Sequence, residues 1–206
     1  MTQQSFKNLV ALIQSDMYRY TRGFSKRDFL KLLVKERGFV TTTVVRITRY
    51  FYLNGPKPLY LLLKIFNRVL QEHYTCEIPH TVGIGPGFQV YHLYGLIIQH
   101  TATLGKNLNL SHYMTIGAKP SGKNAGAPTI LDNVYIASGA KVIGGITVGN
   151  HAAIGANCVV TKDVPDHAVV VGIPGKAISD VGSADYVINT DYEDKIPHLP
   201  LLRDAW

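Results

Sequence analysis

The sequence contains little cysteine, with only Cys76 and Cys158 among its 206 residues. The two lie far apart and match no metal-ligand spacing or disulfide framework, so we expect no bound metal and a reducing, cytoplasmic setting. A cleavable export signal is also lacking at the N-terminus, where Gln3, Gln4 and Lys7 precede a short amphipathic run. We therefore do not expect an exported protein.

Membrane-spanning runs are absent as well. Charged residues interrupt the two most apolar stretches, residues 39–53 and 59–70, before the roughly 20 apolar residues needed to cross a bilayer. Residues 1–75 hold thirteen Lys or Arg against four Asp or Glu, a net charge of +9, whereas the rest of the chain holds eight against ten. No basic pattern interleaved with a stacking platform favours a nucleic-acid partner. The basic segments either pack on their own domain with solvated faces or contact the inner face of a membrane.

Residues 1–75 are predicted to form a basic, helical cap. Apolar residues recur there at three- and four-residue spacing, and Gly55-Pro56 marks a break between helices. We divide the rest of the chain into residues 76–178, which carry a repeat, and residues 179–206. That last segment is a polar extension of uncertain order, and the sequence assigns it no task.

A six-residue period runs through residues 76–178. An aliphatic residue recurs every six positions and an apolar or small residue follows four positions later, a spacing that neither a helix nor an alternating strand produces. The first series is Ile130, Ile136, Val142, Val148, Ile154 and Val160, and the second is Val134, Ala140, Ile146, Ala152, Cys158 and Val164. The same register continues upstream through Ile84, Val90, Ile98, Leu104, Leu110 and Ile116.

The repeat has a structural meaning. Six residues make one short strand and a corner, and three such sides close a triangular coil. Stacked coils bury a column of aliphatic side chains, with Cys158 in an inward position, while small residues allow tight corners. We therefore predict a mainly β protein, a parallel β-helix of hexapeptide repeats, with an α-helical cap at its N-terminus.

Two insertions break the period. Two extra residues fall between Val90 and Ile98, within residues 91–95, and two more fall between Ile116 and Ile130, within the polar, Gly-rich residues 119–127. Loops leave a regular scaffold at such points, and loops on a rigid scaffold are where chemistry concentrates. We expect the functional site there.

Several motifs are family signatures. Val160-Thr-Lys-Asp-Val-Pro and Val171-Gly-Ile-Pro-Gly-Lys176 resemble the end of the hexapeptide-repeat acyltransferases. Glu77 with His92 resembles the serine acetyltransferase branch, and Gly126-Ala-Pro-Thr-Ile130 resembles polysaccharide O-acetyltransferases. The resemblance covers residues 70–178. It implies a left-handed β-helix, acetyl-CoA as the co-substrate, and a homotrimer whose active sites lie between neighbouring subunits.

The resemblance places catalysis at His92, in the first insertion. A hydroxyl attacks a thioester efficiently only with a base whose pKa lies near neutrality, which suits histidine. Glu77, fifteen residues earlier, stands where the family has an aspartate that steadies the imidazole and fixes its tautomer. His112 is the rival base or a substrate contact. Because neither cysteine is placed as a nucleophile, we expect direct transfer without an acyl-enzyme.

The acceptor is predicted to be a sugar, in surface or capsular polysaccharide biosynthesis. Serine acetyltransferases have an aspartate before the catalytic histidine, where this chain has Tyr91, and an Arg-His pair where it has Gly126 and Ala127. A zwitterion needs charged partners, since an unpaired charge in a pocket is costly. Tyr91, Tyr94 and His112 suit a hydroxyl-rich ring. Serine O-acetylation, a step of cysteine biosynthesis, is the alternative.

The acyl donor is expected to lie along an edge of the triangular column. An extended pantetheine arm needs backbone hydrogen bonds beside small side chains, and its nucleotide end needs cations for the phosphates. The residues that match the family's groove are Gly117, Ala118, Ser138 and Ala156, with Lys162 and Lys176 either near the phosphates or solvated.

Two further hypotheses are a zinc-dependent carbonic anhydrase, for which no ligand spacing is found, and a scaffold that binds no acyl donor.

Overall fold

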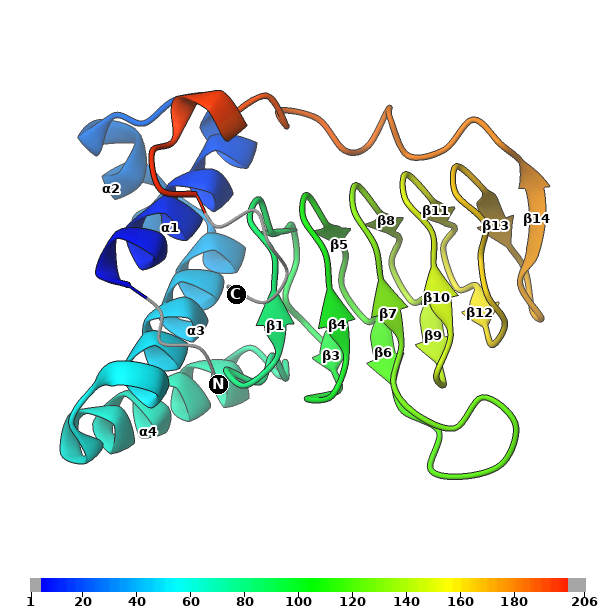
Figure 1. Ribbon diagram of the computed structural model, residues 1–206, viewed down its shortest axis with the longest axis horizontal. Coiled ribbons are helices and arrows are strands. Elements are labelled where there is room, and N and C mark those ends of the chain that lie inside the picture. Colours follow the sequence, from blue (N-terminus) through cyan, green and yellow to red (C-terminus); the bar gives the residue numbers. More distant parts are fainter. Residues whose placement is uncertain (1–4, 200–206) are drawn as a thin grey trace.

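A computed structural model describes residues 5–199, in which helices lie at one end of a column of short strands (Figure 1). The helices are α1 Phe6–Thr21, α2 Lys26–Lys35, α3 Arg37–Asn54 and α4 Lys57–His73. α1 and α2 each follow a serine, Ser5 and Ser25, whose side-chain oxygen accepts a backbone N–H of the first turn. α3 ends before Gly55-Pro56, the predicted break, so the predicted helical region is confirmed.

The strands that follow form three parallel sheets, one on each side of a triangular coil. The first holds β1 Gly83–Ile84, β4 Thr103–Leu104, β7 Thr129–Ile130 and β10 Thr147–Val148; the second holds β3 Ile97–Ile98, β6 Thr115–Gly117, β9 Lys141–Ile143 and β12 Val159–Val160. The third holds β2 Gln89–Val90, β5 Asn109–Leu110, β8 Tyr135–Ile136, β11 Ala153–Ile154 and β13 Val169–Val171, with β14 Lys176–Ser179 added antiparallel at its end. The predicted left-handed β-helix is confirmed.

The core of the column is the predicted aliphatic series. Ile136 pairs in register with Leu110 on one side and Ile154 on the other, so residues of one series stack directly on each other. Both predicted series are almost fully buried, and Cys158 is 0% exposed as expected from its inward position. Removing these side chains from water is the main stabilising contribution, at about 25 cal/mol per Å² of apolar surface.

The corners of the column are not all built with glycine. Several corner residues have left-handed backbone torsions without being glycine, among them Asn107, Asn133, Asn157 and His151, with φ values of 56 to 58°. Asparagine tolerates this conformation better than most residues because its short polar side chain bonds locally. Asn107 also donates to the Asn133 side chain one coil further on, at 2.8 Å. Corner side chains therefore stack along the column as the core does.

The helical cap is tied to the first coil by a buried ion pair. Arg46 of α3 donates to both oxygens of Asp16 of α1, at 2.6 and 2.9 Å, and also to the carbonyl oxygens of Ile84 and Gly85. Burial raises the pKa of the Asp16 carboxyl, and the facing Arg46 guanidinium opposes that rise. Gly38 lets α3 approach the column, because a Cβ there would lie 1.9 Å from the Val90 carbonyl oxygen.

Residues 180–199 of the C-terminal extension lie within the described range. They run back along the column from β14 to the helices and include a short 3-10 helix, η1 Glu193–Lys195 (Figure 1). Ser183 N–H donates to the His151 carbonyl, Asn109 donates to the Tyr186 carbonyl, and Arg19 of α1 donates to the Ile188 carbonyl. These bonds to distant parts of the chain define the path of residues 180–199. Residues 1–4 and 200–206 lie outside the described range.

We expect Asp16→Asn to destabilise the protein by about 3–5 kcal/mol, because it leaves the Arg46 charge buried without its counter-ion. Denaturant unfolding followed by circular dichroism measures the loss. The matched control is Glu72→Gln, which breaks an exposed ion pair with Arg68 and should leave the unfolding midpoint nearly unchanged. Equal losses in the two variants would contradict the special role of the buried pair.

Candidate active site

The parallel register gathers predicted site residues from different coils into one row. Val90, Leu110, Ile136 and Ile154 are successive partners in the third sheet. Two positions beyond each of these residues the chain turns a corner. The side chains in that corner row are His92, His112, Ser138 and Ala156. Two residues predicted for catalysis or the acceptor thus share an edge with two predicted for the acyl donor.

The two histidines of this row are in contact. The ring centroids of His92 and His112 lie 5.4 Å apart, with the rings at 75° to each other. His92 is exposed and His112 is partly buried. His112 Nδ1 is buried and has no hydrogen-bond partner within residues 5–199, whereas the His112 carbonyl accepts the Gly139 N–H at 3.0 Å. An accessible imidazole therefore rests against a second one that has unused hydrogen-bonding capacity.

Tyrosine side chains extend this edge toward the helical cap. The Tyr113 ring lies 5.6 Å from His112, and its position requires Gly95, where a Cβ would lie 2.3 Å from the ring carbon Cδ1. The exposed Tyr94 hydroxyl accepts a hydrogen bond of 2.7 Å from Nη1 of Arg37, the first residue of α3. Tyr91, adjacent to His92, is 44% exposed. The corner thus presents aromatic faces, two imidazoles and a guanidinium from the cap.

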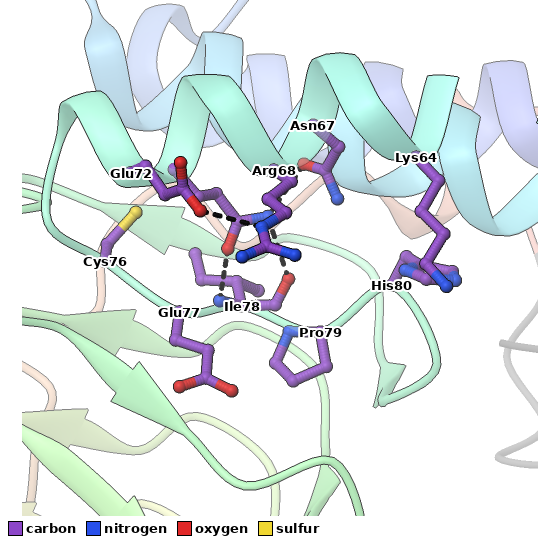
Figure 2. Close-up of a pocket in the computed structure, with 10 residues that line it drawn as sticks. Lys64, Asn67, Arg68, Glu72, Cys76, Glu77, Ile78, Pro79 and His80 are labelled. Carbon is purple, nitrogen blue, oxygen red and sulfur yellow. Dashed lines mark hydrogen bonds and ion pairs between the residues drawn. The ribbon is translucent and has the colours of Figure 1, made fainter. Parts of the chain in front are cut away.

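Glu77 lies beside helix α4, not in the corner row of the histidines. Its backbone bridges to Ile97, so its position is fixed one coil before β3. Its exposed side chain lines a cleft of about 420 Å³ between α4 and residues 76–80, which Figure 2 shows together with Lys64 and Arg68 on the α4 side. Among the described residues, no hydrogen bond or ion pair joins Glu77 to His92. The pairing of these two side chains stays a prediction.

The residues predicted for the acyl donor occupy two edges rather than one. Ser138 and Ala156 share the row with the histidines, whereas Gly117 ends β6 opposite Ile143, and the exposed Ala118 directly precedes the second insertion. A Cβ on Gly117 would lie 2.8 Å from Ile143 Cδ1, so this edge is tightly packed. The roles of these four residues stay predictions.

A lysine-rich hollow lies beside the second insertion. Lys162 lines a hollow of about 530 Å³ together with Lys119, Lys123 and Asn124 of the inserted loop, which protrudes from the column in Figure 1. The loop reaches the end of β12, where Asn124 donates to the Thr161 carbonyl at 3.3 Å. Lys162 also borders a smaller hollow of about 160 Å³ that contains Lys176. Sequence analysis missed Lys119 and Lys123, although both lie in an insertion that it singled out.

No cluster of three or more His, Cys, Asp or Glu side chains suited to a metal is present in residues 5–199. Both cysteines are free and buried. Burial raises the pKa of the Cys76 thiol to about 11 and also raises that of Cys158. Because the thiolate is the nucleophile, neither thiol is activated for attack on a thioester.

We therefore expect both thiols to react slowly with a disulfide reagent at neutral pH in the native protein, and faster as the pH approaches 11. After denaturation both thiols should react rapidly. Absorbance of the released thiolate measures the two rates. Rapid labelling of one thiol at neutral pH in the native state, with loss of acetyl transfer, would contradict direct transfer without an acyl-enzyme.

Comparison with known proteins agrees with this architecture. Residues 127–162 match the family model of the bacterial transferase hexapeptide (six repeats). The serine acetyltransferase of Bacillus pumilus is 39% identical over 152 residues, which cover 74% of this chain and 69% of that protein. The serine acetyltransferase of Buchnera aphidicola is 36% identical over 162 residues, which cover 77% of this chain but only 57% of that protein.

Solved structures of serine acetyltransferases also resemble this chain. The serine acetyltransferase of Neisseria gonorrhoeae in complex with serine superimposes with a TM-score of 0.70 at 29% identity, covering 85% of this chain and 71% of that one. The Brucella abortus enzyme in complex with coenzyme A gives a TM-score of 0.68 at 27% identity, covering 85% and 68%. Fold and repeat together define an acetyl-CoA acyltransferase of the hexapeptide-repeat class. Within that class, the chain belongs to the serine acetyltransferase family.

The prediction of a sugar acceptor is wrong. The relatives and structural neighbours are serine acetyltransferases, and they do not support the polysaccharide O-acetyltransferase branch. The prediction relied on the missing charged residues at Tyr91, Gly126 and Ala127. Positions close in sequence are not the only source of charge, because the cap brings Arg37 to the hydroxyl of Tyr94.

Proposed function

We propose that this chain transfers the acetyl group of acetyl-CoA to the hydroxyl of serine. The observation that carries the proposal is the 39% identity to a serine acetyltransferase over 74% of the chain. The paired imidazoles of His92 and His112, on an exposed corner beside small side chains, agree with it.

The proposed reaction is a direct acyl transfer. The serine oxygen attacks the thioester carbonyl carbon while His92 takes the hydroxyl proton, and collapse of the tetrahedral intermediate breaks the carbon–sulfur bond. The coenzyme A thiolate then leaves, and the imidazolium of His92 gives its proton to the thiolate sulfur. His92 is the preferred base because it is the more exposed ring of the pair. His112 is the second candidate, since its buried Nδ1 lacks a partner among the described residues.

Binding of serine requires partners for its carboxylate and its ammonium group. We assign the carboxylate to Arg37, because a guanidinium offers parallel N–H donors that match a carboxylate. Arg37 is exposed and already reaches the edge of the site through Tyr94. The exposed rings of Tyr91 and Tyr94 offer electron-rich faces to the ammonium group. These assignments replace the sugar contacts first expected of the tyrosines.

Coenzyme A is proposed to lie along the column toward the lysine-rich hollow. Ser138 and Ala156 are small and follow the histidines along one row, which leaves backbone groups accessible to an extended amide chain. Lys162 with Lys119 and Lys123 supplies three cations in one hollow for the phosphates of the nucleotide. By family resemblance, we place the complete site between neighbouring columns of a homotrimer.

We expect His92→Ala to lower kcat/KM for serine by about 10²–10⁴-fold, the usual contribution of general base catalysis. Release of the coenzyme A thiol from acetyl-CoA and L-serine measures the rate. His167→Ala, which removes a histidine stacked on His151 at a different corner, is the matched control and should keep full activity.

Each of the other outcomes has a distinct meaning. Activity retained in His92→Ala but lost in His112→Ala would transfer the role of base to His112. Activity retained in both would refute the site. Failure of L-serine to stimulate thiol release by the unchanged protein would refute the proposed acceptor.

Arg37→Gln should raise the KM for serine about 10- to 100-fold with little change in kcat, since a hydrogen bond to a charged group contributes about 1.5–3 kcal/mol. The KM for acetyl-CoA should not change. Arg37→Lys should restore part of the affinity because it keeps the charge but not the fork of donors. Lys35→Gln, an exposed cation two residues earlier, is the control. A fall in kcat without a change in KM for serine would contradict a binding role.

A further inference from the structure

Helix α4 presents an apolar face that no other described part of the chain covers. Five large apolar side chains of the helix are more than half exposed: Leu61 53%, Leu62 64%, Ile65 62%, Phe66 54% and Val69 58%. Their spacing of three and four residues places them on one side of the helix. The opposite side carries the buried Asn67 and Gln71. Gln71 exchanges hydrogen bonds with the backbone of Ile78, and Asn67 accepts from the Gln71 side chain.

Cations form a stripe beside this face. Lys57, Lys64 and Arg68 are seven and four residues apart, so they project from one flank of the helix. Figure 2 shows Lys64 and Arg68 on the flank of α4 that borders the cleft. The single acidic residue of the helix, Glu72, is bound to Arg68 at 2.7 Å. The flank therefore carries net positive charge, in a cap region whose residues 1–75 total +9.

An apolar face with a basic flank fits an anionic membrane surface. The apolar side chains insert at the boundary between headgroups and acyl chains while long basic side chains reach the lipid phosphates. No helix within residues 5–199 is long and apolar enough to cross the bilayer, so such contact would be peripheral. We propose that α4 docks this protein on an anionic lipid surface. This proposal does not depend on the identity of the acetyl acceptor.

A second copy of the chain fits the same face less well. An antiparallel pair of α4 helices, related by a two-fold axis perpendicular to both, would place the stripes of Lys57, Lys64 and Arg68 from both copies on the same side of the contact. Like charges in such a contact repel, and Glu72 is already occupied by Arg68. An anionic surface meets no such repulsion, because it attracts each basic side chain that approaches it.

Sedimentation with lipid vesicles tests the proposal. The full chain should bind vesicles of phosphatidylcholine with phosphatidylglycerol, bind phosphatidylcholine alone much less, and lose affinity as salt is raised. Ile65→Glu should weaken binding at least about tenfold, since it replaces an inserted apolar side chain by a charge. Lys64→Glu should weaken it roughly fivefold or more.

Two control variants separate the position of the change from its chemistry. Ile178→Glu charges an equally exposed isoleucine, 65% exposed, on β14 at the far end of the column. Lys7→Glu makes the same change in net charge as Lys64→Glu but on α1. Both should bind vesicles like the unchanged chain. Ile65→Glu should also keep acetyl transfer in solution, which shows that the variant folds and keeps failure of this proposal distinct from failure of the enzymatic one.

Three outcomes would overturn the proposal. The first is failure to bind anionic vesicles, and the second is equal binding to neutral and anionic vesicles. The third is a change in solution mass by light scattering in Ile65→Glu, which would assign the α4 face to contact between copies of the chain.

Discussion

The stacking of one aliphatic side chain on the next, coil after coil, is the constraint on which the rest of the structure depends. Each strand of the column is only two to four residues long, so it has little stability of its own. Burial of residues such as Ile136 and Ile154 in a shared column sets the register between coils. A shift by one residue would turn these side chains outward, which the core does not tolerate. Residues at the corners, including His92 and His112, are aligned as a consequence.

The helical cap belongs to the same constraint because it closes the open end of the column. Arg46 donates to Asp16 and to carbonyl oxygens of the first coil, and Asp16 accepts the Phe88 N–H, so these buried polar groups all have partners. Gly38 allows α3 to touch the Val90 carbonyl, and the adjacent Arg37 thereby reaches the hydroxyl of Tyr94 at the edge of the candidate site. The returning C-terminal segment is also bound to the cap, because Arg19 of α1 donates to the Ile188 carbonyl. The cap therefore both stabilises the column and completes the candidate site.

The wrong acceptor illustrates how charge is distributed in this fold. Local sequence around Tyr91 and Ala127 contains no side chain for a zwitterion, and that observation is correct. The serine acetyltransferase relatives overturned the inference. Under the proposed function the cation is Arg37, which lies 54 positions before Tyr91 in the chain and donates to the Tyr94 hydroxyl. No periodicity, spacing or motif in the sequence predicts the contact between Arg37 and Tyr94. Identity to serine acetyltransferases over most of the chain outweighs the local resemblance of residues 126–130 to polysaccharide O-acetyltransferases.

The sequence alone predicted the coiled column and the buried position of Cys158, because a strict six-residue period admits few other folds. It also predicted the helical region and the two insertions. The tertiary structure alone decided which side chains meet. It brought His92 against His112, turned Glu77 into a separate cleft, joined Lys119 and Lys123 to Lys162, and gave residues 180–199 a path along the column. Repeats specify burial through local pattern, whereas contacts between distant segments depend on packing that no single stretch of sequence contains.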